Sequence, residues 1–319
     1  MKLNKMINLI RNENMKLSHS ISTWIMMGIL VLIIVIVGLV SRFGGNETPK
    51  SDWKADIKIQ NQSIKESLAR PEIPKMVKDN LKNDLQTNEY RLEHNIQPIQ
   101  GNSLWGFVED VGTGLISLIA LFAIVMGGGI VANEFSGGTI KLLLIRPSKR
   151  WKILISKYIS VIGYILLMLL LLFVVSFLLG GALFSFKGAG TPFLTNFNGK
   201  ITEVNMIVHI LQLYGLKCIG LLMMVTLAFM ISTVFRNSAM AIGIGVFLLT
   251  VGNGITMLLS RYTWSKYILF ANTDLNQYIN GEPLVKGMTM TFSITVLIVY
   301  FVIFNVISYF GFTRRDIVA

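Results

Sequence analysis

The stretch WIMMGILVLIIVIVGLV, residues 24–40, contains no charged residue and belongs to one of six long apolar runs in this chain of 319 residues. About 20 mostly apolar residues in a helix are enough to cross the hydrocarbon core of a bilayer. A spanning segment must satisfy its own backbone polar groups, so this run predicts a transmembrane helix. No small-residue cleavage site follows it, and we therefore interpret it as a retained span rather than a signal peptide.

The whole chain has the composition of a polytopic membrane protein. Hydrophobic residues make up 53% of it and charged residues only 14%, whereas about 25% of residues are charged in soluble globular proteins. This balance excludes a disordered chain and an ordinary soluble enzyme. The predicted fold is an all-α integral membrane protein with six transmembrane helices, at residues 22–43, 111–132, 153–180, 206–234, 239–259 and 289–312.

Basic residues gather on one side of these spans. If the loops 133–152 and 235–238 and the tail 313–319 face the same side as the N-terminus, that side carries 13 basic and three acidic residues, counting Lys157 at the start of the third span. Short segments rich in Lys and Arg stay in the cytoplasm. We therefore predict that both termini are cytoplasmic, and we assign the net charge of +12 to the membrane surface rather than to nucleic acid.

Two polar segments have helical patterns. Within residues 1–21, the apolar residues Leu3, Met6, Ile7 and Ile10 recur at helical spacing among basic residues, which predicts an N-terminal amphipathic helix in the cytoplasmic interface. Residues 44–110 carry a weak apolar stripe before the sequence RPEIP at 70–74 and a stronger one after it, at Val77, Leu81, Leu85, Leu92 and Ile96. Because proline ends helices, we predict an extracytoplasmic helical hairpin between spans one and two.

The remaining connections read as external loops. Residues 181–205 are rich in glycine, and residues 260–288 carry Trp264, Tyr267 and Tyr278. Tyrosine and tryptophan are enriched where a membrane meets water, so we expect these three side chains in the aromatic belt of the outer interface.

No catalytic or metal-binding arrangement is evident in the sequence. It lacks a phosphate-binding G-x-x-x-x-G-K-[ST] loop, and its three histidines, His19, His94 and His209, lie far apart. The one cysteine, Cys218, excludes an intramolecular disulfide. We expect no enzymatic activity, no metal and no cofactor in this chain.

Lys217 is the one clear case of an ionisable residue well inside a predicted span. Charges at membrane depth often mark transport pathways, but a lysine near a helix end can instead extend its ammonium group to the interface.

Small residues also recur four apart, at Ala123 and Gly127, Ala239 and Gly243, and Ala241 and Gly245. Such pairs allow helices to approach closely, either within one bundle or between two copies.

The segment NEFSGGTIKLLLIRPSKRWKILISKY, residues 133–158, is the most specific part of the chain. It resembles the cytoplasmic loop of the type-2 permease family of ATP-binding-cassette exporters. The residues that carry the resemblance are Glu134, Gly138, Thr139, Leu142, Leu143, Pro147, Arg150 and Lys157. The six-span layout, the N-terminal helix and the large first outer segment also match, whereas Ser156 departs from the glycine that many members have before the lysine.

The resemblance implies a coupling loop, at residues 133–152, that docks into a separate ATPase subunit. The residues that would make this contact are Glu134, Phe135, Gly138, Thr139, Arg146 and Pro147. ATP and Mg²⁺ would be bound by that partner, and a second permease copy or a paralogous permease would complete the assembly. We expect Glu134 to lie in the loop and to stay hydrated, where an acid suits the N-terminus of a short helix.

These features predict a permease subunit that exports a peptide, an antibiotic or a lipid-like substrate across the cytoplasmic membrane. The abundance of Lys, Asn and Ile is typical of a low-GC bacterium, which indicates a bacterial cell membrane. The alternative is a membrane sensor or immunity protein that binds a toxic peptide through the outer hairpin without transport.

Overall fold

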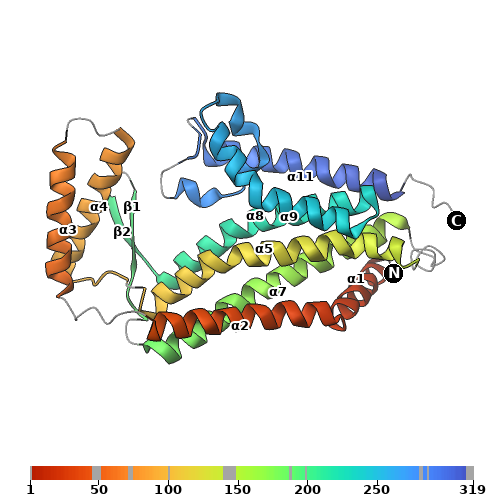
Figure 1. Ribbon diagram of the computed structural model, residues 1–319, viewed down its shortest axis with the longest axis horizontal. Helices are drawn as coiled ribbons and strands as arrows, with labels where there is room; N and C mark the ends of the chain where they lie inside the picture. The colour runs from red at the N-terminus through yellow and green to blue at the C-terminus, as the bar shows by residue number, and fades with distance from the viewer. Residues whose placement is uncertain are drawn as a thin grey trace. The chain divides into compact units, whose positions relative to one another are not determined.

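The computed structural model describes residues 2–44, 52–70, 75–99, 101–138, 149–186, 189–197, 200–279, 283–285 and 287–313. Among these residues, six helices are long and apolar enough to cross a membrane (Figure 1). They are α2 (Ile21–Phe43), α5 (Leu104–Ser136), α7 (Arg150–Phe184), α8 (Met206–Phe235), α9 (Ser238–Leu259) and α11 (Met290–Thr313). The predicted all-α integral membrane fold is confirmed, and each span corresponds to one apolar run.

Two spans are longer than the sequence pattern predicts. Helix α5 begins at Leu104 rather than at residue 111, because Leu104, Trp105 and Phe107 bury their side chains and continue the packed face. It also runs four residues past the predicted end, to Ser136. Helix α7 begins at Arg150, inside the predicted coupling loop. The connection between them is therefore shorter than the predicted 133–152.

The chain divides into two compact units. Unit one comprises Met1–Leu32, Thr113–Leu172 and Leu213–Ala319, and unit two comprises Ile33–Gly112 and Phe173–Gln212. Because the boundaries fall inside α2, α5, α7 and α8, these helices contribute to both units.

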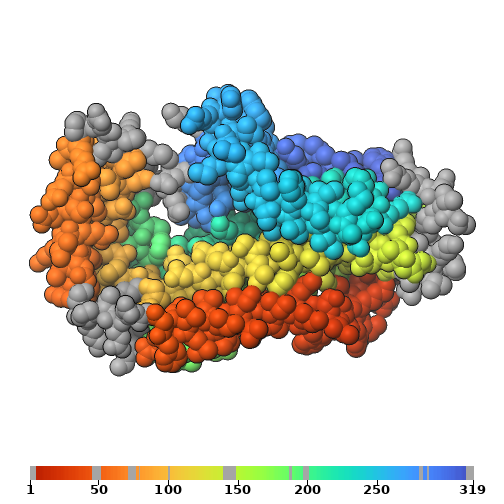
Figure 2. All heavy atoms as spheres, in the orientation of Figure 1, coloured from red at the N-terminus to blue at the C-terminus, as the bar shows by residue number. Residues whose placement is uncertain are grey.

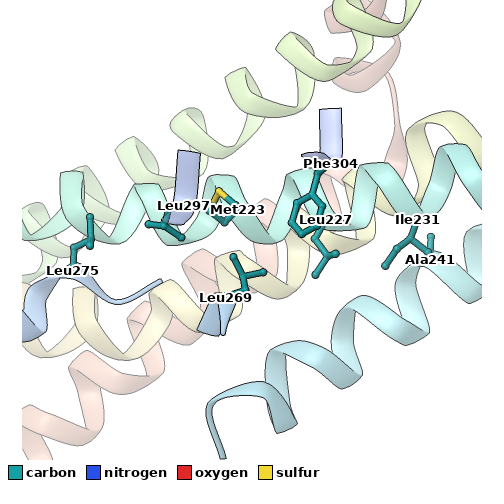
Figure 3. Packing of buried hydrophobic residues seen from close by; sticks show 8 residues of the cluster. All are labelled: Met223, Leu227, Ile231, Ala241, Leu269, Leu275, Leu297 and Phe304. Atoms are coloured by element: carbon teal, nitrogen blue, oxygen red, sulfur yellow. The ribbon is translucent and has the colours of Figure 1, made fainter. Parts of the chain in front are cut away.

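Unit one contains a bundle with an apolar core. One cluster of buried residues joins α8, α9 and α11 to the segment between α9 and α11 (Figure 3). Its members are Met223, Leu227, Ile231, Ala241, Leu269, Leu275, Leu297 and Phe304. By contrast, α9 exposes one side along its length, and its side chains form part of the visible surface in Figure 2.

The small residues explain how closely these helices pack. A Cβ atom at Gly127 would lie 3.3 Å from the carbonyl oxygen of Val225, and one at Gly245 would lie 2.5 Å from Ile124. These two glycines therefore allow α5 to approach α8 and α9. A Cβ atom at Gly243 would meet nothing within 4 Å. Of the three predicted pairs, those ending at Gly127 and Gly245 pack inside the chain, and the pair ending at Gly243 faces outward.

Unit two contains the predicted helical hairpin. Helices α3 (Trp53–Leu68) and α4 (Lys75–His94) pack against each other. The apolar stripe before RPEIP, which is the weaker one in the sequence, lies on α3 and is the more buried of the two. Ile57 is 3% exposed and Ile64 is 7% exposed.

The prediction of a loop at 181–205 is wrong over most of its length. Helix α7 continues to Phe184, and the strands β1 (Phe193–Phe197) and β2 (Lys200–Val204) form an antiparallel pair. The amide of Asn196 in β1 donates a hydrogen bond to the carbonyl oxygen of Asn83, which attaches the strands to α4 (Figure 1). This contact joins residues that are 113 positions apart, so no local pattern reveals it.

Candidate functional site

Glu134 and Phe135 lie inside α5, near its C-terminal end, and not in a loop. The expectation that Glu134 sits hydrated at the N-terminus of a short helix is therefore wrong. A carboxylate near a helix C-terminus is electrostatically unfavourable, because the backbone dipole is negative there. Its position needs compensation by positive charge.

Two lysines supply that compensation. Oε1 of Glu134 accepts hydrogen bonds from Nζ of Lys16, in α1 (Lys2–Ser18), and from Nζ of Lys157, in α7, both at 2.9 Å. Lys157 also donates to Oε2 of Glu13, in α1, at 2.9 Å. Nζ of Lys16 lies 3.6 Å from Oε1 of Glu13. These four residues, here called the charge quartet, connect three helices.

The charge quartet is largely shielded from solvent. The side chain of Lys157 is 1% exposed, that of Glu13 is 7% exposed and that of Glu134 is 12% exposed, whereas Lys16 is half exposed. A buried charge is tolerated when it is paired and hydrogen-bonded, and the two lysines balance the two glutamates. The quartet is thus a neutral group whose members depend on one another.

Lys16 remains protonated throughout the physiological range. Burial lowers the pKa of its ammonium group, but the hydrogen bond to Glu134 and the charges of both glutamates outweigh that effect. The net result is a pKa above the ordinary value of 10.5. Because a raised lysine pKa stabilises the folded state below the ordinary value, this contribution is fully present at neutral pH.

Glu13 and Lys16, both in α1, are the two members of the quartet that the resemblance does not include. Helix α1 turns Met6, Leu9, Ile10 and Glu13 inward, while Ile7 of the predicted apolar face is 54% exposed. The sequence does carry a signal for the position of Glu13. This residue follows Met6 and Ile10 at helical spacing, so it lies on the same face of α1 as these apolar residues. The predicted amphipathic helix is present, but its packed face includes a charge.

Phe135 points to different neighbours. Its ring lies edge-on to that of Phe312 in α11, with the centroids 6.3 Å apart. The guanidinium group of Arg236, in the turn between α8 and α9, lies 4.6 Å from the centre of the Phe135 ring. In addition, Nη1 of Arg150 donates to the carbonyl oxygen of Thr313 at 3.3 Å. Adjacent residues at the end of α5 therefore contact α1 and α7 through Glu134, and α11 and the α8–α9 turn through Phe135.

Gly138 ends α5 by its backbone conformation. Its φ is +68°, and its N–H donates to the carbonyl oxygen of Phe135 at 3.2 Å. Glycine adopts this left-handed conformation without a steric penalty and commonly terminates helices in this way. The other predicted contact residues, Thr139, Arg146 and Pro147, lie outside the described residues.

Ser156, the departure from the family pattern, is accommodated inside the bundle. It is 1% exposed, and its hydroxyl donates to the carbonyl oxygen of Ile153 in the preceding turn, at 2.8 Å.

Beside the quartet, a groove of about 330 Å³ is lined by Lys16, Gly129, Ile130, Asn133 and Glu134. Within the described residues, no group of three or more His, Cys, Asp or Glu side chains could hold a metal ion.

The chain resembles proteins of known sequence over most of its length. It is 44% identical to "Uncharacterized protein YhcI" of Bacillus subtilis (strain 168), over 98% of this chain and 99% of that protein. It is 35% identical to "Uncharacterized membrane protein YdbK" of the same organism, over 63% of this chain and 78% of that protein. The model of a family described as "Protein of unknown function (DUF2705)" matches residues 79–318. The chain therefore belongs to the DUF2705 family.

Proposed function

We propose that this chain is the permease subunit of an ATP-binding-cassette exporter of the type-2 kind. One observation carries the proposal: Glu134 on the helix that enters the predicted coupling loop is joined to Lys157 on the helix that leaves it, at 2.9 Å and largely buried. Both residues belong to the motif of the resemblance. A turn that only connects two spans functions without a buried ion pair between them. In a loop that transmits force, this ion pair makes the two helices move together.

The contacts of the end of α5 suit transmission of movement. A partner that pushed the coupling loop would displace Glu134 and Phe135 together, because both lie in the last turn of one rigid helix. Through Glu134 the displacement would reach α1 and α7, and through Phe135 it would reach α11 and the α8–α9 turn. The end of α5 thus acts as a junction from which several spans move together.

The partners follow from this mechanism. Two ATPase subunits would bind ATP and Mg²⁺ and come together on the cytoplasmic side, and a second permease, identical or paralogous, would form the other half of the pathway. Helix α1 would lie in the inner membrane interface, with the exposed side chains of Ile7 and Met15 toward lipid. The chain itself would carry out no hydrolysis.

Crosslinking tests both the orientation and the partner. A cysteine that replaces Lys149, which is exposed beside the coupling loop, and one that replaces Ile59, which is 68% exposed on α3, are compared in a Cys218→Ser background. Ile59 is preferred to its neighbour Asn61, which is 7% exposed. In cells of the source organism, a short bifunctional thiol crosslinker should join Lys149→Cys to an ATP-binding-cassette ATPase subunit. Ile59→Cys should instead react with an impermeant thiol reagent added outside.

Two outcomes would contradict the proposal in different ways. If Lys149→Cys reacts from outside and Ile59→Cys does not, the orientation is reversed. If the orientation holds but the ATPase never crosslinks, transport loses its support, and a sensor or immunity protein that binds peptides through unit two becomes the better reading.

A further inference from the structure

The C-terminal end of α5 lies at one surface of the membrane. Arg236, which contacts the ring of Phe135 at that end, belongs to the turn from which α9 begins. Helix α9 has 22 residues, so it is about 33 Å long at ~1.5 Å per residue, close to the ~30 Å thickness of the hydrocarbon core. One end of α9 is therefore at the same surface as the end of α5, and its other end is at the opposite surface.

The segment that follows α9 marks this opposite surface. The loop predicted at 260–288 is partly folded, into η1 (Thr263–Tyr267), α10 (Leu269–Asn272) and η2 (Leu275–Tyr278). Tyr262, Trp264 and Tyr267 are each more than half exposed, as an aromatic belt requires. Tyr278 does not join them, because its hydroxyl is hydrogen-bonded to Ser293 of α11. The polar residues at the end of α5 therefore meet water and lipid headgroups at the other surface.

The groove beside the charge quartet lies at the end of α5. Two helices form it, because Lys16 belongs to α1, whereas Gly129, Ile130, Asn133 and Glu134 belong to α5 (Figure 1). Gly129 and Ile130 precede Asn133 and Glu134 by about one turn, roughly 6 Å along the helix axis. The groove is thus polar at the membrane surface and apolar toward the hydrocarbon core. A phospholipid has the same gradient, from its headgroup to its acyl chains.

Two side chains can donate hydrogen bonds into the groove. Asn133 is exposed, and within the described residues its side-chain amide makes no hydrogen bond. This amide covers Gly129, where a Cβ atom would lie 3.0 Å from Nδ2 of Asn133. The ammonium group of Lys16 has three N–H donors, and the two carboxylates beside it, at 2.9 Å and 3.6 Å, accept at most two of them.

The groove presents both signs of charge. Lys16 and Glu134 line it, and the quartet to which they belong has no net charge. A ligand that carries only a phosphate would bring its negative charge close to Glu134, whereas a ligand with a phosphate and an amine has one group for each partner. A primary ammonium group can also donate hydrogen bonds to a carboxylate, and a quaternary ammonium group has no N–H to donate.

We propose that this groove binds a phospholipid whose zwitterionic headgroup carries a primary amine, of the phosphatidylethanolamine type. Lys16 and Asn133 hold the phosphate, Glu134 accepts hydrogen bonds from the amine, and the start of an acyl chain covers Gly129 and Ile130. The lipid thereby fills the space between α1 and α5 beside the charge quartet. This site does not depend on transport, because the isolated chain contains every residue of it.

Lipid binding to the purified full-length chain in detergent tests the choice of headgroup. Native mass spectrometry gives the apparent affinity of the first bound lipid for phosphatidylethanolamine, phosphatidylcholine and phosphatidylglycerol with identical acyl chains. Phosphatidylethanolamine should bind about three- to tenfold more tightly than each of the others, the effect of about one hydrogen bond, because both lack the N–H donors for Glu134. Equal affinities for the three lipids would overturn the proposal.

Two substitutions test the groove without removing a member of the charge quartet. Asn133→Leu should weaken phosphatidylethanolamine binding about three- to tenfold, and Asn253→Leu is the matched control, because Asn253 is exposed on α9. Gly129→Leu should abolish the preference for phosphatidylethanolamine, since the new side chain fills the groove. Its control is Gly163→Leu, on α7, where a Cβ atom meets nothing within 4 Å. If Gly129→Leu fails to fold, the exposed Asn133 decides the outcome. Binding like that of the parent chain in folded Asn133→Leu or Gly129→Leu would overturn the proposal.

Soluble phosphoethanolamine distinguishes a lipid from a free phosphorylated amine. It carries the same charged groups but has no acyl chain to cover Ile130, so it should displace the lipid only at a concentration more than about tenfold higher than that of the lipid. Displacement at equal concentrations would mean that the groove binds a soluble compound, and it would overturn the assignment to a lipid.

Discussion

Replacing Lys157 with methionine is expected to destabilise the protein by about 3–5 kcal/mol, because removal of one partner from a buried ion pair leaves an uncompensated charge. In this case two carboxylates, those of Glu13 and Glu134, would lose the ammonium group between them. Lys16, which is half exposed, remains 2.9 Å from Glu134 but lies 3.6 Å from Glu13, so it only partly replaces the lost charge. The measurement is the thermal unfolding of purified protein in detergent, together with its abundance in the membrane.

Two controls identify the cause of the loss. Lys149→Met removes a lysine that is exposed just before α7, and it should leave stability unchanged. Adding Glu13→Gln and Glu134→Gln to Lys157→Met removes the stranded charges, so this triple variant should recover most of the lost stability. If Lys157→Met is as stable as the parent protein, the charge quartet does not hold α1 to α5 and α7.

Under the proposed function, Gly138→Val is expected to remove most of the stimulation of the partner ATPase while membrane abundance stays near normal. The φ of +68° at this residue costs an ordinary residue roughly 1–2 kcal/mol, and a β-branched one is especially disfavoured. Helix α5 would then end differently, and the coupling loop would leave its position. Glu134 and Phe135 precede this point and keep their contacts, which is why the bundle should survive.

The matched variant is Gly138→Asn, because asparagine tolerates the left-handed conformation better than other residues. If Gly138 matters through the helix end, Gly138→Asn should retain most of the stimulation. If both variants lose it, close approach of the partner to this glycine is the cause, since a Cβ atom here meets nothing within 4 Å inside the chain. Full stimulation in both variants would exclude Gly138 from coupling.

The membrane fold could be predicted because each span is a long apolar run, and helices in lipid satisfy their own backbone. The ends of the spans could not, because they depend on packing. Leu104, Trp105 and Phe107 extend α5 by burying their side chains among neighbours distant in sequence. Strands β1 and β2 were also not predicted, because they are short segments close to glycines and they pair only with each other.

The candidate site was partly predictable. Glu134 and Lys157 stand out in a motif, but their direct contact requires α5 to extend further than hydropathy indicates. Glu13 lies 144 positions before Lys157, so sequence spacing cannot connect the two residues. The largest difference concerns Glu134. The sequence predicts a hydrated position for it, because the predicted span ends two residues before it, whereas α5 continues to Ser136. Lys217 pairs with Asp274, which lies in the segment between α9 and α11 and therefore outside the predicted spans.

The most direct test of the proposed permease function is the ATP hydrolysis rate of the ATPase subunit recovered by crosslinking to Lys149→Cys, purified with and without this chain. The proposal predicts a stable complex whose hydrolysis depends on the chain and whose stimulation falls with Gly138→Val. An ATPase that neither co-purifies with the chain nor changes its rate in its presence would contradict the proposal.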